Sequence, residues 1–456
     1  MKRFASAILI ICLLCAGLFI VYSLEIKPIE SLIRPPEYSD EGGSVQAALE
    51  AEIGKTYLLK TPTKGEHTSA FVYYDIDADE KKEAVVLYSD IKEPDSVNMC
   101  IFKQEESSWK RLASVSSPYS DVIQIDFADI NGNGVSDIIV GLSSYSSEIV
   151  QHLFVYSVNS MDREHPALTI RYECDYSRYC VLDVDRDKQC ELLVLNSNDT
   201  EEDYGYEADL IRFTSLKSVV VGTIFLDSAL RIVSKISFDF ETDKSGARMY
   251  IDGYTSDGKM LTDMILWDKK SNSLVSMKIG KKSFASLTTR IKTAVCDDID
   301  SDGIIDVPTD YVLPASKSIT AQGDKAIILL HYVSVNGNRL KNSGYYFENS
   351  VNGYYYKIDK SILKNITVVT SQDASSAKFY TVKETGKGRI TADRLIFEIR
   401  TVTDLETGRA PQTFKSLGQN KEFYYYCRIY EKGENAGLTI SGIRDNLIFG
   451  LKGSSK

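Results

Sequence analysis

The chain has 456 residues, of which 43% are hydrophobic and 26% charged, a composition typical of a globular protein and not of a disordered one. Its formal net charge of −11 argues against nucleic-acid binding, which requires a concentrated basic face. The length exceeds what one ordinary core supports, so two or three folded units are expected.

An uncharged run, Ala5–Leu24, follows Lys2 and Arg3 at the N-terminus. A helix of about 20 residues spans roughly 30 Å, the thickness of a bilayer core. Because flanking basic residues stay in the cytoplasm, the sequence predicts that residues 1–24 are a single-pass signal anchor and that the body is extracytoplasmic, at the cell surface. The alternative is a signal peptide cleaved near Ser23, which would give a secreted, extracellular protein.

Residues 25–45 have the composition of a linker, since they combine prolines, two adjacent glycines and charges of both signs. The pattern over Val45–Ile53 predicts a short helix that leads into the folded part.

One motif then recurs: a short apolar strand, an acidic loop and a second apolar strand. The acids that open the four loops lie at positions 75, 129, 183 and 298, at intervals of 54, 54 and 115. Since 115 is close to two periods, a degenerate copy is expected near position 240, where Asp239, Glu241 and Asp243 keep the phase.

Each unit also contains further short apolar runs without helical periodicity, about four strands in all. This pattern is typical of β-propeller blades, and residues 46–335 have room for about five of them. Six or seven blades stay open, because strands further along the chain can contribute.

The loops carry oxygen-bearing side chains at positions 1, 3, 5 and 9. Calcium takes 6–8 oxygen ligands at about 2.3–2.6 Å, and such spacing lets one short loop wrap an ion. The sequence therefore predicts calcium as a cofactor. The predicted ligands are Asp75, Asp77, Asp79, Glu83, Asp129, Asn131, Asn133, Asp137, Asp183, Asp185, Asp187, Glu191, Asp298, Asp300, Asp302 and Asp306.

These loops resemble the FG-GAP or VCBS repeats of integrin-type β-propellers, in which D-x-[DN]-x-[DN]-G-x-x-D binds calcium. The second and fourth copies match best, because Gly134 and Gly303 supply the turn glycine. In the first and third copies Glu80 and Lys188 replace the glycine, and Glu replaces the last Asp, so weaker or distorted sites are expected there. The resemblance implies a calcium-loop propeller over residues 46–335, in which the ions stiffen the fold. Any single copy is also consistent with a turn that binds no metal.

After Pro314 the acidic repeat stops, and strand-like runs end in an amphipathic segment. Residues 336–456 are therefore predicted to form a separate α+β domain. Its tyrosine clusters, Tyr354–Tyr356 and Tyr424–Tyr426, allow either a sugar-stacking platform or ordinary half-buried strand aromatics.

No nucleophile elbow, zinc-protease motif or P-loop is found, and the four histidines are dispersed. The sequence therefore favours a membrane-anchored, calcium-binding propeller that is not an enzyme and acts as a binding or scaffold module. Its partner would be a protein or a cell-envelope carbohydrate. The alternative is a polysaccharide-active lyase or hydrolase on a propeller scaffold. A carboxylate or lysine in the central channel, away from metal, would favour that alternative.

Overall fold

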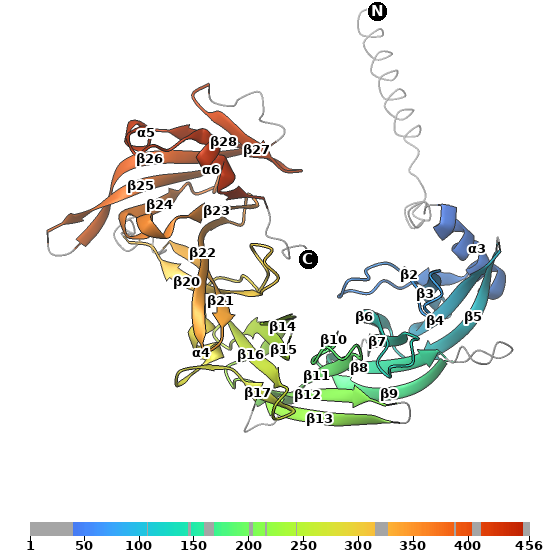
Figure 1. Cartoon of the computed structure of the whole chain (residues 1–456). Coiled ribbons are helices and arrows are strands. Elements are labelled where there is room, and N and C mark those ends of the chain that lie inside the picture. Colours follow the sequence, from blue (N-terminus) through green and yellow to red (C-terminus); the bar gives the residue numbers. More distant parts are fainter. Residues whose placement is uncertain are drawn as a thin grey trace, which may run out of the picture.

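A computed structural model describes residues 40–106, 108–144, 147–158, 168–199, 204–214, 217–242, 244–314, 327–386, 389–403 and 412–449 (Figure 1). The predicted anchor, residues 1–24, lies outside these ranges, as does most of the predicted linker. Within them, no helix has both the length and the apolar character needed to cross a membrane.

The described chain is mainly β, as the sequence predicts, and its strands pair antiparallel in six sheets of four or five strands. We number these sheets 1–6 in chain order. Sheet 1 contains β1 (Tyr57–Leu59), β2 (Phe71–Tyr74), β3 (Glu83–Asp90), β4 (Glu93–Glu105) and β5 (Ser108–Ser117). Sheet 2 contains β6 (Asp121–Ala128), β7 (Asp137–Ser144), β8 (Ser147–Val158) and β9 (Leu168–Tyr176).

The next two sheets have the same four-strand meander. Sheet 3 contains β10 (Arg178–Leu182), β11 (Glu191–Asp199), β12 (Tyr204–Phe213) and β13 (Ser218–Phe225). Sheet 4 contains β14 (Ile232–Phe240), β15 (Ala247–Tyr254), β16 (Met260–Asp268) and β17 (Ser273–Ser276). A small hairpin, β18 (Lys278–Ile279) with β19 (Lys282–Ser283), and helix α4 (Phe284–Thr288) follow.

Sheet 5 contains β20 (Asp306–Val312), β21 (Ile328–Asn336), β22 (Arg339–Asn349), β23 (Tyr354–Ile358) and, from the far end of the chain, β29 (Leu447–Ile448). Sheet 6 contains β24 (Ile366–Thr370), β25 (Ser376–Thr385), β26 (Arg389–Thr403), β27 (Lys415–Gln419) and β28 (Phe423–Ile429). The short helices here are η2 (Lys360–Asn365), α5 (Glu431–Asn435) and α6 (Ile440–Asp445). The boundary expected between residues 335 and 336 falls at the β21–β22 hairpin, inside sheet 5.

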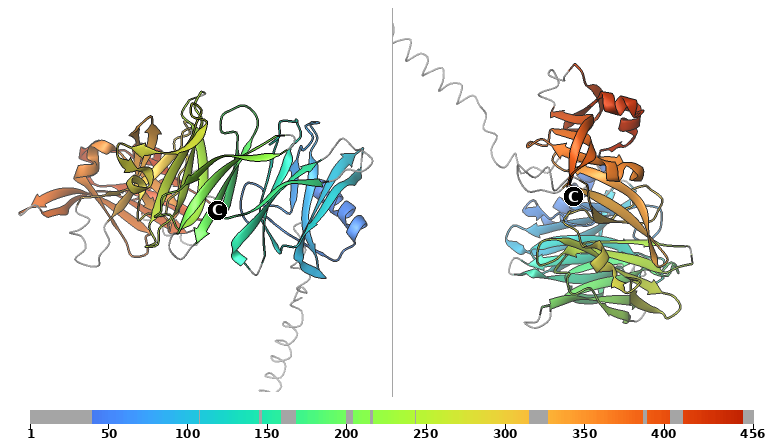
Figure 2. Two further views of the ribbon diagram at one scale, coloured as in Figure 1. Left: turned by 90° about the horizontal axis from the view of Figure 1, so that it is seen from below. Right: turned by 90° about the vertical axis from the view of Figure 1, so that its left-hand side faces the viewer.

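Sheets 1 to 4 follow one another along a curve, with the first strands of each sheet towards its inside and the last strand at its outside (Figure 1). The curve does not close into a ring. Sheets 1 and 6 lie at opposite ends of the molecule in Figure 1 and again in the left view of Figure 2.

Neighbouring sheets pack face to face and share hydrophobic cores, which explains the sequence of the central strands. One core joins sheets 1 and 2, and others join sheets 2 and 3, 3 and 4, 4 and 5, and 5 and 6. A central strand therefore buries both of its faces. This is why β3 and β7 read as continuous apolar runs, whereas an outer strand such as β9 is mostly exposed or half-buried along its length.

The free face of sheet 1 is covered by helix α3 (Asp40–Ile53), which begins within the predicted linker. Val45 and Leu49 are fully buried against Phe71 and Phe102 of this sheet. A stack of sheets needs such a cap, because its terminal sheet otherwise exposes an apolar face to water.

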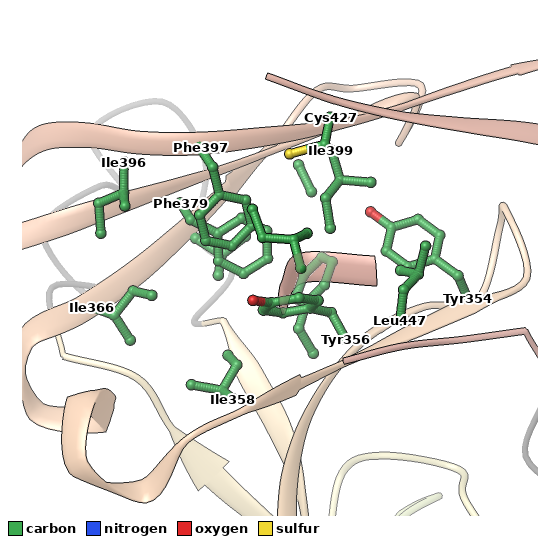
Figure 3. Packing of buried hydrophobic residues seen from close by; sticks show 14 of the residues in the cluster. Tyr354, Tyr356, Ile358, Ile366, Phe379, Ile396, Phe397, Ile399, Cys427 and Leu447 are labelled. Carbon is green, nitrogen blue, oxygen red and sulfur yellow. The ribbon is translucent and has the colours of Figure 1, made fainter. Parts of the chain in front are cut away.

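Sheets 5 and 6 enclose the largest aromatic core (Figure 3). Phe379 and Phe397 stack at its centre with ring centroids 4.2 Å apart, and Tyr356 packs edge-on against Phe379. Strand β29 returns to pair with β23, so the C-terminal segment closes this core.

Candidate metal centres

Three of the four acidic loops connect the two strands of a hairpin, namely β2 and β3 in sheet 1, β6 and β7 in sheet 2, and β10 and β11 in sheet 3. The fourth loop precedes β20, the first strand of sheet 5. We call them the Asp75 loop (residues 75–83), the Asp129 loop (129–137), the Asp183 loop (183–191) and the Asp298 loop (298–306). In each, the first aspartate accepts hydrogen bonds from the backbone N–H groups at positions 5 and 6, at 2.7–3.1 Å. The position-5 side chain accepts the N–H of position 7 at 2.8–2.9 Å. The position-9 carboxylate accepts the N–H of position 2. All four loops therefore share one backbone fold.

This fold requires left-handed backbone at positions 4 and 6. Glu80 and Lys188 occupy position 6 with φ of 68° and 77°, close to the 83° and 84° of Gly134 and Gly303. The strain expected from the missing glycines is thus present, at a cost of about 1 kcal/mol or more for each residue. Position 4 is left-handed as well, which the sequence pattern did not indicate.

Consecutive loops are also bonded to one another in a row. The N–H of Ser136 in the second loop donates to the carbonyl of Ile76 in the first, at 2.8 Å. The N–H of Cys190 in the third donates to the carbonyl of Asp129 in the second, at 3.4 Å. Any change in the shape of one loop is therefore felt by its neighbour.

A lysine from a neighbouring strand fills the Asp75 loop. Oxygens of Asp75, Asp77 and Glu83 lie within 4.8 Å of one another, a spacing that suits a metal ion. The Lys103 ammonium on β4 forms ion pairs with Asp77, with Asp79 at 2.9 Å and with Glu83 at 3.2 Å. Burial alone would lower the pKa of Lys103, but its hydrogen bonds to the three carboxylates outweigh burial and raise that pKa. A permanent positive charge already offsets part of the negative charge of this loop.

An arginine fills the Asp183 loop in the same way. Oxygens of Asp183, Asp185 and Glu191 again lie within 4.8 Å of one another. Arg212 on β12 donates from Nε to Glu191 at 2.7 Å and from Nη2 to Asp185 at 2.8 Å, and its guanidinium lies 5.8 Å from the ring centre of Trp267. Glu191 is completely buried, and the N–H of Val184 at 2.9 Å together with this ion pair compensates its charge.

The Asp129 loop is satisfied by neutral groups. Its buried Asp137 accepts hydrogen bonds from the Asn131 amide at 2.9 Å and from the Ser157 hydroxyl. Burial raises the pKa of Asp137, and the loop holds only one further carboxylate, Asp129. This loop needs no cation to balance its charge, although its oxygens suit one.

The Asp298 loop differs from the others in its charge balance. Oxygens of Asp298, Asp300 and Asp302 lie within 4.8 Å of one another, and Asp306 is buried beside them. No lysine, arginine or histidine in the described ranges forms an ion pair with any of these four acids. Burial raises the pKa of Asp306 to about 6, and the charges of Asp300 and Asp302 also raise it. A divalent cation would relieve this repulsion.

The four loops therefore differ in whether a protein cation already balances their carboxylates. Oxygen ligands suit calcium in all of them. Only the Asp298 loop combines four carboxylates with no charged partner from the described chain. In the Asp75 and Asp183 loops a tethered cation takes the position that an ion would need, so those loops do not fit calcium while the cation is in place.

At the degenerate copy near position 240, the acidic side chain forms an ion pair between two neighbouring strands instead of a loop. Asp239 lies within β14, where Arg248 binds it through Nε at 2.6 Å and Nη2 at 2.8 Å. Asp239 also accepts the N–H of Ile305, in the Asp298 loop, at 2.7 Å. Glu241 accepts a hydrogen bond from the N–H of Gly337, and Asp243 lies outside the described residues. This copy joins sheet 4 to the Asp298 loop.

The two tethered cations were not recognised from the sequence, but a signal for them exists. Lys103 and Arg212 follow the position-9 glutamates by 20 and 21 residues, and both loops have Glu where the other two have Asp. At the matching places the other units have serine: Ser157 bonds Asp137, and Ser334 pairs with Asp306 across the sheet. Loop position 9 and the residue opposite it on the neighbouring strand thus form a position pair, which is either glutamate with a cation or aspartate with serine.

Comparisons with known proteins add no relative. The sequence matches no family model, and a search of curated proteins finds no match. The resemblance to FG-GAP or VCBS repeats thus rests on the loop residues alone.

Proposed function

We propose that this chain is a binding or scaffold module built on a propeller-type array, in which calcium at the Asp298 loop fixes one sheet to the next. The observation that supports it best is the group of Asp298, Asp300 and Asp302 beside the buried Asp306, in a loop that has the backbone fold of the other three but no tethered cation from the described chain. In this proposal sheets 1 to 5 correspond to blades, and the array is an open curve and not a closed ring.

The calcium stoichiometry follows from the charges in the loops. The Asp298 loop is the principal site, and the Asp129 loop, with two carboxylates, is a weaker one. The Asp75 and Asp183 loops take no calcium, because Lys103 and Arg212 occupy the position among their carboxylates that an ion would take. The module sits outside the cytoplasm on the N-terminal anchor, with a protein or cell-envelope carbohydrate as its partner.

Thermal unfolding of the purified body, residues 40–456, in calcium and in EDTA tests this proposal. With a dissociation constant of about 10⁻⁴–10⁻³ M, 10 mM calcium stabilises the folded state by about 1.4–2.7 kcal/mol. The double variant Asp298→Ala/Asp300→Ala should lose most of this shift. The matched variant Asp183→Ala/Asp185→Ala should melt lower in EDTA yet keep the full calcium shift. Equal shifts in both variants, or no shift in the wild type, would refute calcium binding at the Asp298 loop.

One cluster on the inner strands favours the alternative of a polysaccharide-active enzyme. The backbone N–H of Lys64 donates to the carbonyl of Ile123, which places the segment before β2 against β6. Burial, together with the charge of Arg178, lowers the pKa of Lys64 to about 8. Burial raises the pKa of Asp126, three residues after Ile123 on β6, and this carboxylate accepts a hydrogen bond from Gln124 at 2.8 Å. A lysine with such a pKa is suited to proton abstraction.

Incubation with acidic polysaccharides tests this alternative, with new unsaturated sugar ends followed by ultraviolet absorbance. Cleavage that Lys64→Met abolishes, and Lys60→Met does not, would support an enzyme. Absence of cleavage across the substrates would leave the binding module as the better description.

A further inference from the structure

A cavity of about 530 Å³ opens at one end of sheet 6, far along the chain from the acidic loops. Its walls are the ends of β24 and β26, the start of β25 and the turn between β24 and β25. Its volume lies in the range of small-molecule sites, about 300–1,000 Å³. Hydroxyl and charged side chains dominate the lining, which disfavours an apolar ligand.

Arg400 is held in place on this cavity by a buried carboxylate. Side chains alternate along β26, so Phe397 and Ile399 enter the core of Figure 3 while Glu398 and Arg400 face the other side. Glu398 is 2% exposed and accepts hydrogen bonds from Arg400 at 2.9 Å, from Ser376 at 2.8 Å and from the Tyr430 hydroxyl at 3.0 Å. One bond from Nη2 therefore positions the guanidinium, and its central carbon lies 4.8 Å from the centre of the Phe414 ring. Within the described residues its remaining N–H groups donate to no other group and can meet a ligand.

Lys378 supplies a second cation. It lies on β25 beside Glu398 in the strand register and is half-buried. In the described part of the chain its ammonium makes no ion pair and no side-chain hydrogen bond. Glu398, the residue opposite it, is already bonded to Arg400, Ser376 and Tyr430, so an anionic ligand would give the Lys378 ammonium a partner of its own.

The acidic residue of the cavity is already engaged. Asp373 accepts hydrogen bonds from the hydroxyls of Ser371 and Ser375 and from the Ser375 N–H. These bonds lower the pKa of Asp373, with that from Ser371 contributing most, so it remains an anion held by its own turn. The serine hydroxyls keep lone pairs and can also bind ligand hydroxyls.

We propose that this cavity binds a saccharide unit that carries a carboxylate, such as a uronic acid. Arg400 and Lys378 would bind the carboxylate, since guanidinium groups pair with carboxylates in a planar geometry, and the serine-rich turn would bind ring hydroxyls. The net charge of −11 opposes more highly charged anions. The choice of a saccharide rests on the proposed binding-module function, but the cavity does not depend on calcium at the Asp298 loop.

The site is tested by titrating the body of the chain with small-molecule probes and measuring their binding by ligand-observed NMR, once in calcium and once in EDTA. The probes are D-glucuronate, D-glucose as the neutral sugar and inorganic phosphate as the anion without ring hydroxyls. Glucuronate should bind at least tenfold more tightly than either control probe. Lys378→Met should weaken glucuronate binding tenfold or more. Lys383→Met removes a lysine further along β25 that pairs with Asp393 of β26, and it should not weaken binding.

Two further variants separate this site from the calcium site. Asp298→Ala/Asp300→Ala should keep glucuronate binding, and Lys378→Met should keep the calcium shift in melting temperature, which also shows that it folds. Equal binding of phosphate and glucuronate would overturn the saccharide assignment. Unchanged binding by folded Lys378→Met, or no binding by the wild type, would overturn the site itself.

Discussion

Replacing Arg212 with methionine should make the Asp183 loop dependent on calcium. The substitution keeps an apolar stem against Trp267 but leaves the buried Glu191 and its neighbour Asp185 without their cation. Removing one partner of a buried ion pair costs about 3–5 kcal/mol. Because the Arg212 side chain is 25% exposed, water can reach the loop, and a loss near 3 kcal/mol is expected. For a unit of 150–250 residues this lowers the melting temperature by about 6–12 °C.

Calcium should then recover part of the loss. The Arg212→Met variant exposes three carboxylates with the spacing of a metal site. At 10 mM calcium and a dissociation constant of about 10⁻⁴–10⁻³ M, binding returns about 1.4–2.7 kcal/mol in addition to the wild-type shift. The assay is thermal unfolding with and without calcium, and isothermal titration should count one more bound ion per chain. Lys217→Met, which replaces an exposed lysine just before β13, is the control. The reasoning fails if Arg212→Met is as stable as the wild type, or if its calcium shift is no larger.

Two other predictions concern parts of the molecule away from the metal loops. The pKa of Lys64 is lowered to about 8 in the folded state. Between pH 8 and about 10.5 Lys64 therefore binds fewer protons in the folded state than in the unfolded state. Its contribution to the free energy of unfolding should rise with pH over that window. Acylation of Lys64 at pH 8, measured by mass spectrometry, should exceed that of exposed Lys55, and equal labelling would contradict the lowered pKa. Phe379→Ala removes a fully buried ring stacked on Phe397 and should cost about 3–5 kcal/mol in denaturant unfolding, whereas Ala at exposed Phe225 should cost little.

Much of the β structure follows from local sequence. The two apolar runs around each of the first three acidic loops form the strands expected of them, because a strand buried on both faces must be apolar throughout. Before the Asp298 loop the expected strand is reduced to an isolated bridge between Asp297 and Asp306. The turn glycines also have the left-handed backbone that their positions imply. These features depend only on residues within one hairpin.

Features that depend on distant residues were missed. Lys103 and Arg212 reach their loops from a strand about 20 residues further on, so cross-strand register decides their role. The phase of the repeat placed Asp239 in a loop, but the turn there is shorter: Phe240 pairs with Ala247, whereas Leu182 pairs with Glu191. The end of the acidic repeat suggested a domain boundary at residue 335, yet sheet 5 continues beyond it, because a sheet needs pairing partners and not acidic loops.

The position pair between loop and neighbouring strand predicts that a cation added to the Asp298 loop will displace calcium, the reverse of removing Arg212 from the Asp183 loop. Ser334 pairs with Asp306 in the register that places Lys103 and Arg212 beside their glutamates. A lysine at position 334 can therefore bring its ammonium to the carboxylates of this loop and take the place of calcium. Ser334→Lys should melt at least as high as the wild type in EDTA and lose most of the calcium shift, while Ser334→Ala should keep that shift. Ser334→Arg serves as a second variant if the lysine does not fold. A folded Ser334→Lys or Ser334→Arg protein that binds calcium like the wild type would show that the tethered cations and calcium do not compete for one position.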